Sequence, residues 1–232
     1  MYNERYSREE YQWFFQKKAE RCLAALERNN IKGYYTQNRG EARLRLLEMI
    51  PEGATIGAGG SLTLLQVGIM EELEKRGSHQ IYNPFRKEGK EYYPPLETVL
   101  QEIAEVGKKA IMTDIFLTGI NAITLDGKLL NTDGFGNRSA ALIFGPEKVI
   151  IVSGVNKIVA NLDEAMRRVK EVAAPMNAWR LEKKWGYPPS PCGITGICVD
   201  CKGVRHCVYT VIVEYQTLQR IEVVLVGEHL GY

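Results

Sequence analysis

Short apolar runs that alternate with helical segments are the feature that most constrains how this chain folds. The runs at 54–58 and 148–153 are predominantly apolar, and each leads into a turn that contains glycine. Strands without a polar face are typical of parallel sheets that helices cover on both sides. We therefore predict an α/β fold with a doubly wound, mainly parallel sheet, in which these two strands are neighbours or lie close together.

Similar patterns predict the other elements. Ser7 and Glu10 fit a capping box at the start of a helix over 7–30. Asp126-Gly127 fits the turn of a hairpin, and two β-branched strands joined by a polar turn end the chain. Further helices are expected at 39–49, 62–76, 96–106 and 136–145, and from Asn161 or Asp163 to Pro175, with a strand at 79–82. The stretch at 83–95 lacks periodicity and is predicted to be a long exposed loop.

The composition fits a single globular domain over residues 1–232. Hydrophobic residues make up 45% of the chain and charged residues 25%, which excludes disordered and fibrous proteins. No stretch has the character of a flexible linker. Within the domain we expect a helical arm at 1–50 and a four-cysteine segment at 186–209.

The charge balance limits the classes of partner. Thirty basic and twenty-eight acidic residues leave a formal net charge of +2, too little for a broad nucleic-acid interface. No apolar run approaches the roughly 18 residues of a membrane span. The charged N-terminal sequence lacks the apolar segment of a secretory signal. We expect a cytoplasmic protein with no membrane span and no nucleic-acid partner.

The glycine-rich turn between the strand at 54–58 and the following helix is a candidate ligand site. Glycines allow a ligand to approach the backbone, and hydroxyl groups add hydrogen-bond donors for phosphate, carboxylate or carbonyl oxygens. The candidate residues are Gly59, Gly60, Ser61 and Thr63. The alternative is a tight turn in which Ser61 only caps the helix. The turn matches neither a Walker A loop nor a complete G-x-G-x-x-G motif, so no nucleotide motif is found.

A second group of polar residues follows the strands in the middle of the chain. Asn121, Asp133, Asn137 and Arg138 are candidates for binding an anionic ligand, although asparagine and aspartate also stabilise turns. Lys157 follows a predicted buried strand, where α/β sheets often place ligands, but a surface lysine is the simpler interpretation. Because loops after parallel strands share one edge of a sheet, we predict that these residues line a pocket with the glycine-rich turn. Catalytic residues remain unassigned.

Four cysteines near the C-terminus predict a metal site. Cys192, Cys198, Cys201 and Cys207 lie within sixteen residues, spaced C-x5-C-x2-C-x5-C. An odd total of five cysteines and the absence of an export signal argue against a disulfide framework. Four thiolates suit an iron–sulfur cluster, of the 4Fe–4S type, or tetrahedral zinc, and the compact run favours the cluster. The alternatives are metal-free thiols, or His206 in place of one ligand.

Five stretches of the chain resemble the LUD (lactate-utilisation) domain family, from about residue 10 to the C-terminus. They are IGAGGSLTL at 56–64, the run from Thr118 to Val159, APMNAWRL at 174–181, PCGITGICVDC at 191–201 and VVLVGEHLGY at 223–232. Gln66 departs from the pattern, because many members carry a glutamate there. The resemblance implies a fold similar to ribose-5-phosphate isomerase, glucosamine-6-phosphate deaminase and CoA transferases, in which the glycine-rich turn contacts phosphate or carboxylate groups.

Two classes of function follow from this resemblance. The best-known relatives, similar to lactate-utilisation protein C, work beside two iron–sulfur proteins in oxidising L-lactate to pyruvate. The first expectation is therefore a component of L-lactate or similar 2-hydroxy-acid utilisation, with iron–sulfur redox partners and a small carboxylate or phosphate ligand. The second is a stand-alone small-molecule enzyme with a structural zinc. A ligand-binding subunit without turnover is a third.

Overall fold

A six-stranded sheet forms the centre of the molecule. The computed structural model describes residues 7–232, so residues 1–6 of the predicted arm lie outside the described residues. The sheet order is β1-β12-β9-β6-β2-β3, and every neighbouring pair is parallel. The strands are β1 (Lys32–Thr36), β2 (Ile56–Ala58), β3 (Ile81–Tyr82), β6 (Ile115–Gly119), β9 (Lys148–Gly154) and β12 (Ile221–Val226). The predicted α/β fold with its mainly parallel sheet is confirmed. One strand, β6, separates the two strands expected to lie close together.

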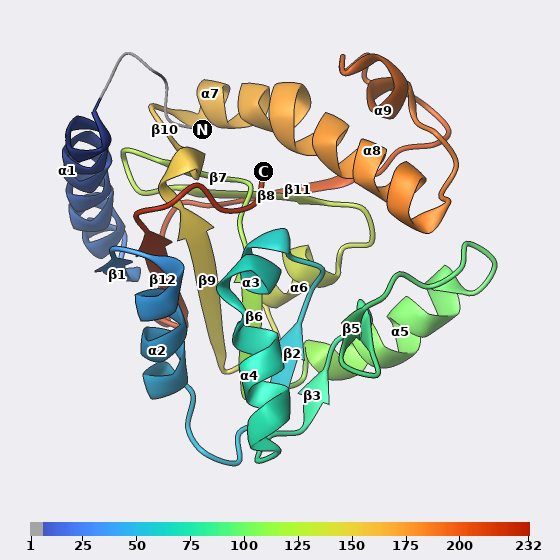
Figure 1. The fold of residues 1–232 in the computed structure, drawn as a ribbon, viewed down its shortest axis with the longest axis horizontal. Coiled ribbons are helices and arrows are strands. Elements are labelled where there is room, and N and C mark those ends of the chain that lie inside the picture. Colours follow the sequence, from blue (N-terminus) through green and yellow to red (C-terminus); the bar gives the residue numbers. More distant parts are fainter. Residues whose placement is uncertain (1–6) are drawn as a thin grey trace.

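Helices cover both faces of this sheet (Figure 1). The helices that pack on it are α1 (Arg8–Arg28), α2 (Arg39–Met49), α3 (Leu62–Val67), α4 (Ile69–Arg76), α5 (Val99–Ala110) and α6 (Asn137–Ile143). The remaining described helices are α7 (Leu162–Arg168), which packs on a smaller sheet, α8 (Ala174–Trp185) and α9 (Pro191–Thr195). Successive side chains of a strand point to opposite faces. Phe116 therefore packs with α1, α5 and α6, whereas Leu117 packs with α2, α3 and α4. Both faces of the central strands are apolar because both are covered.

A smaller sheet stands beside the main one, in the order β10-β7-β8-β11. Its strands are β7 (Ala122–Thr124), β8 (Leu129–Asp133), β10 (Ile158–Val159) and β11 (Tyr209–Val213). The predicted hairpin at Asp126-Gly127 joins β7 and β8. The two strands expected at the end of the chain are present but belong to different sheets, because β11 pairs with β8 and β12 enters the main sheet between β1 and β9. The apolar residues of β12 are buried on both faces, which a terminal hairpin would not provide.

Several other boundaries differ from the predictions. The arm contains a strand, β1, which joins the main sheet. Gly68, with φ +75°, divides the helix expected at 62–76 into α3 and α4. The helix from Asn161 does not end at Pro175, because the proline stands in the first turn of α8, where it costs no hydrogen bond. A π-helical turn at Val169–Ala173 joins α7 to α8, and the rod crosses the top of Figure 1.

The stretch at 83–95 is not a plain loop. It contains a small antiparallel hairpin of β4 (Arg86–Lys87) and β5 (Lys90–Glu91). In the part of the chain that the structure describes, we find no helix with the length and apolar character needed to cross a bilayer.

Candidate functional site

A cavity of about 470 Å³ lies where the main-sheet strands β6 and β9 end. Ligands of open α/β sheets characteristically bind at this edge. Eight of the nine residues predicted to bind a ligand line the cavity: Gly60, Ser61, Thr63, Asn121, Asp133, Asn137, Arg138 and Lys157. The structure therefore brings the glycine-rich turn and the two polar runs to one place. The ninth residue, Gly59, lies beside a much smaller adjoining pocket.

The glycines of the turn are required by close packing. A Cβ atom on Gly59 would lie 2.6 Å from Cγ of Arg138. The side chain of Arg138 therefore packs directly against the backbone of the turn, and a residue other than glycine would clash with it. A Cβ on Gly60 would lie 3.0 Å from the hydroxyl of Tyr93 and 3.2 Å from the ring of Phe85. Ser61 caps α3, as the simpler interpretation expected, by accepting a hydrogen bond from the Leu64 N–H. The turn thus positions Arg138 and the aromatic wall of the cavity.

Asp133 organises the loop that carries Arg138. Its carboxylate accepts hydrogen bonds from the Gly136 N–H, the Ser139 N–H at 2.9 Å and the Ser139 hydroxyl at 3.0 Å. These bonds fix the start of α6 and occupy the acidic oxygens. Arg138 donates to the Thr132 carbonyl oxygen at 2.7 Å, and burial lowers the pKa of its guanidinium. We find no bidentate pair between Asp133 and Arg138 among the described contacts.

The two asparagines of the cavity differ in their bonding. Oδ1 of Asn121 accepts from the Thr132 N–H at 2.8 Å and ties β8 to the end of β6. Nδ2 of Asn137 is buried and has no hydrogen-bond partner among the described residues. A buried donor without a partner is unfavourable unless a ligand or water accepts from it. Asn137 is therefore the better candidate for direct ligand contact.

Lys157 is buried rather than on the surface. Its residue is 3% exposed, and Nζ donates to Oγ1 of Thr63 at 2.9 Å. Burial lowers the pKa of its amine to about 7, with smaller contributions from the guanidinium groups of Arg168 and Arg138. Its position after a buried strand was visible in the sequence, but the groups that enclose it come from distant segments.

Sequence reasoning missed a second wall of the cavity. Arg180 on α8 donates to the hydroxyl of Tyr93 at 2.5 Å and to the carboxylate of Glu91. Tyr232 and His206 also line the cavity, and burial raises the pKa of Tyr232 to about 12. Arg180 and Tyr232 belong to stretches quoted for the family resemblance, APMNAWRL and VVLVGEHLGY. Their place in these stretches was the one sequence feature that could have pointed to them, but the resemblance gave neither residue a role.

The four cysteines are not gathered into one site. Cys192 is buried in α9, whereas Cys198, Cys201 and Cys207 are half-buried in the following segment. Within the described residues, no three His, Cys, Asp or Glu side chains are placed to hold a metal ion. Burial raises the pKa of Cys207, and Cys198 and Cys201 are near enough to raise it further, against the effect of Arg205. As arranged here the thiols do not fit a cluster or zinc, and the metal stays a prediction.

Comparison with known proteins gives one family. The model of the LUD domain matches residues 19–226. No curated protein matches the chain significantly.

Several solved structures are similar over part or most of the chain. A DUF162 family protein from Deinococcus radiodurans is 14% identical, with a TM-score of 0.47, covering 92% of this chain and 98% of its own. Ribose 5-phosphate isomerase from Plasmodium falciparum is 18% identical, with a TM-score of 0.35, covering 53% of this chain and 52% of its own. 5-Methylthioribose 1-phosphate isomerase from Pyrococcus horikoshii is 14% identical, with a TM-score of 0.37, covering 76% and 51% respectively.

Proposed function

The chain belongs to the LUD domain family, and from this premise we propose that its cavity binds a small carboxylate or phosphate. The further proposal is a role in utilisation of L-lactate or a similar 2-hydroxy acid. In this role iron–sulfur proteins in the cytoplasm accept the electrons of the oxidation. The anion site is the part that the geometry supports best.

The charge of the cavity wall carries this proposal. Three arginines, Arg138, Arg180 and Arg205, line the cavity together with the amine of Lys157, which is only partly charged at neutral pH, against the single carboxylate of Asp133. That carboxylate already accepts three hydrogen bonds from the loop before α6 and from α6 itself. Arg180 pairs with Glu91 and Arg205 with Asp200, whereas Arg138 has no carboxylate partner among the described ion pairs. An anionic ligand would therefore meet a wall with more positive than negative groups, in which arginine forks suit carboxylate and phosphate oxygens. The unpartnered Nδ2 of Asn137 supplies a further donor.

A 2-hydroxy acid matches these groups in kind. Its carboxylate would pair with the guanidinium groups, and its hydroxyl oxygen would accept from Asn137. A stand-alone enzyme of the isomerase or CoA-transferase type would use the same anion site. The two proposals differ in whether the chain turns over a substrate without a redox partner.

Calorimetric titration with L-lactate, pyruvate and inorganic phosphate tests the anion site. We expect at least one anion to bind, and Gly60→Val to weaken binding by about tenfold or more, because valine would push Tyr93 and Phe85 into the cavity. Circular dichroism of the variant should match that of the parent chain. Arg76→Gln, which removes a cation on α4 that is not among the cavity-lining residues, is the matched control and should leave affinity unchanged. Equal affinity of Gly60→Val and the parent chain would remove this cavity from consideration.

A further inference from the structure

Lys157 places an amine at the wall of the cavity. It ends the 3-10 turn Val155–Lys157 that follows β9, and its side chain reaches Thr63 at the start of α3. A Cβ on Gly231 would lie 2.9 Å from Nζ and 2.5 Å from Oγ1 of Thr63. Because Gly231 has no side chain, the amine of Lys157 and the hydroxyl of Thr63 fit beside its backbone.

Among residues 7–232, no acidic side chain forms an ion pair with this amine. The charged groups that act on it are Arg138 of α6 and Arg168 of α7, both cations, and Asp133 is occupied by the backbone of its own loop. Burial and these two cations lower the pKa of Lys157 to about 7, so a large share of the amine is uncharged at neutral pH. Desolvation beside another cation is a known way to make a lysine nucleophilic.

We propose that Lys157 is a nucleophile that forms a reversible imine with the carbonyl carbon of a small anionic carbonyl compound, specifically a 2-oxo acid. This rests on the proposed function, because the cations of the same cavity would hold the carboxylate of that acid. A 2-oxo acid is the product of oxidising a 2-hydroxy acid, so the ligand class agrees with that role.

The step is balanced without any other reagent. The Nζ lone pair attacks the carbonyl carbon, a C–N bond forms, and the carbonyl oxygen takes one proton from the amine. The carbinolamine then loses that oxygen as water, together with the second amine proton, and a C=N bond remains. Hydrolysis reverses the sequence and restores the amine.

Borohydride reduction of an equilibrated mixture tests this proposal. Protein is incubated at neutral pH with pyruvate, or in a second arm with glyceraldehyde 3-phosphate, then reduced, digested and mapped by mass spectrometry. With pyruvate we expect the reduced adduct on Lys157 to exceed that on any exposed lysine by at least about tenfold, because far more of its amine is uncharged. Saturation with inorganic phosphate, if it binds by calorimetry, should suppress the adduct. Lys157→Met should abolish the adduct, and Lys128→Met, at a partly exposed ion pair with Glu214, should not.

Each outcome separates the two proposals. An adduct at Lys157 with pyruvate supports both the imine and the 2-oxo acid. An adduct with the phosphorylated aldehyde alone overturns the 2-oxo acid assignment. Calorimetric binding of pyruvate with no adduct on Lys157 of the parent chain overturns the imine and leaves the anion site intact. Absence of both binding and adduct overturns the proposed function as well. Because the map is made on the parent chain, the test does not depend on how well the variant folds.

Discussion

The buried amine of Lys157 has a consequence for stability. Its pKa is 10.5 in an unfolded chain and about 7 in the folded one, because burial disfavours the charged form. Between these two values the unfolded state binds more protons than the folded state. Stability therefore rises with pH across this window, and below about pH 7 the full cost of burying the charge is present. A residue selected for stability alone would be apolar at this position.

We expect Lys157→Met to be more stable than the parent chain near pH 7, by up to about 4 kcal/mol, since one pKa unit corresponds to about 1.4 kcal/mol. The difference should shrink as the pH rises toward 10.5. Urea unfolding of both proteins at several pH values between these limits measures it. Lys128→Met removes a partly exposed lysine and should change stability by less than about 1 kcal/mol at every pH. A difference that did not vary with pH would contradict the burial of an uncharged lysine.

The position of Lys157 could be predicted from the sequence, but its burial could not. A lysine after an apolar strand is found at the ligand-binding edge of the sheet, which is where the structure has it. Its burial depends on Thr63, 94 residues earlier, and on Gly231 near the end of the chain. Neither proximity follows from local pattern. The same holds for Asp133, whose role in fixing α6 depends on how the loop at 133–139 closes.

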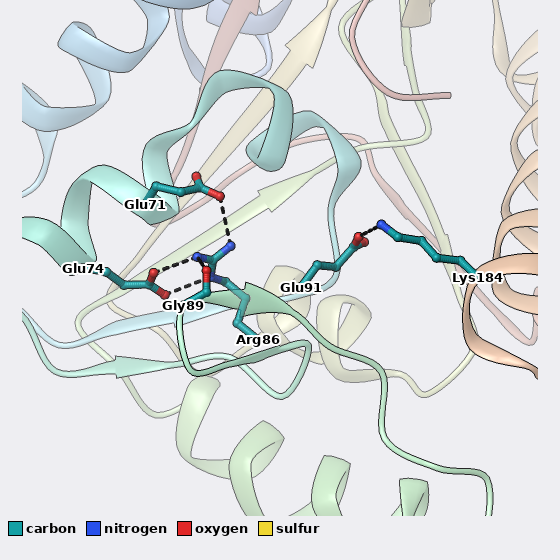
Figure 2. Close-up of polar contacts among 6 residues, drawn as sticks. All are labelled: Glu71, Glu74, Arg86, Gly89, Glu91 and Lys184. Atoms are coloured by element: carbon teal, nitrogen blue, oxygen red, sulfur yellow. Dashed lines mark hydrogen bonds and ion pairs between the residues drawn. The ribbon is translucent and has the colours of Figure 1, made fainter.

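At the scale of elements, the hairpin of β4 and β5 holds one wall of the cavity in place. Figure 2 shows Arg86 lying between the hairpin and α4. Its guanidinium binds both oxygens of Glu74 at 2.7 and 2.8 Å, Glu71 at 3.1 Å and the Gly89 carbonyl oxygen at 2.6 Å. Glu91, at the other end of the hairpin, pairs with Lys184 and Arg180 of α8. The hairpin thus links α4 to α8.

Removing Arg86 should loosen this link. Its side chain is only 5% exposed, so Arg86→Met would leave two carboxylates without their partner. Because Glu71 and Glu74 are 41% and 31% exposed and remain partly hydrated, we expect a cost of about 1–2 kcal/mol. Because Phe85 and Tyr93 flank the hairpin and line the cavity, we also expect weaker anion binding. Faster hydrogen exchange at 86–92 would report the local opening. Arg76→Met removes the exposed ion pair between Arg76 and Glu72 within α4. It should have little effect on anion binding or on hydrogen exchange. Unchanged exchange in Arg86→Met would show that the ion pairs do not hold the hairpin.

The hairpin itself was not predictable from the sequence. The stretch at 83–95 has neither an apolar run nor a periodic pattern, so it was predicted to be a loop. Its two short strands are held by ion pairs to α4 and α8 rather than by an apolar face. The helix and strand signals that succeeded, such as the Ser7–Glu10 capping box and the apolar run of β9, depend on local chemistry alone.

For the whole molecule, the sequence predicted the class of fold but not all of its connections. Apolar runs without a polar face required a covered parallel sheet, and β2, β6 and β9 form its centre. The sequence showed two strands joined by a polar turn at the end of the chain, but it did not show which strands they pair with. In the structure β12 fills the position between β1 and β9, and β11 closes the smaller sheet.

We expect the organisation of the four-cysteine segment to depend on whether the protein holds a metal. Residues 186–209 contain many prolines and glycines and few periodic apolar residues, so core burial alone cannot order them. Cys198, Cys201 and Cys207 are half-buried there, whereas Cys192 is held in α9 against α8. Gathering four thiolates would require the segment to fold back toward α9.

We therefore expect protein prepared without oxygen to contain iron and sulfide, or zinc, at about one site per chain, with the segment rearranged around it. Metal and sulfide analysis measures the first, and slower hydrogen exchange at 186–209 on metal loading measures the second. Cys201→Ser should lose the metal, whereas Cys22→Ala should keep it, because Cys22 lies in the core against Thr124 and far along the chain from the other four. Protein with neither iron nor zinc would leave these cysteines as ordinary thiols. A redox role would then depend entirely on partners that carry their own clusters.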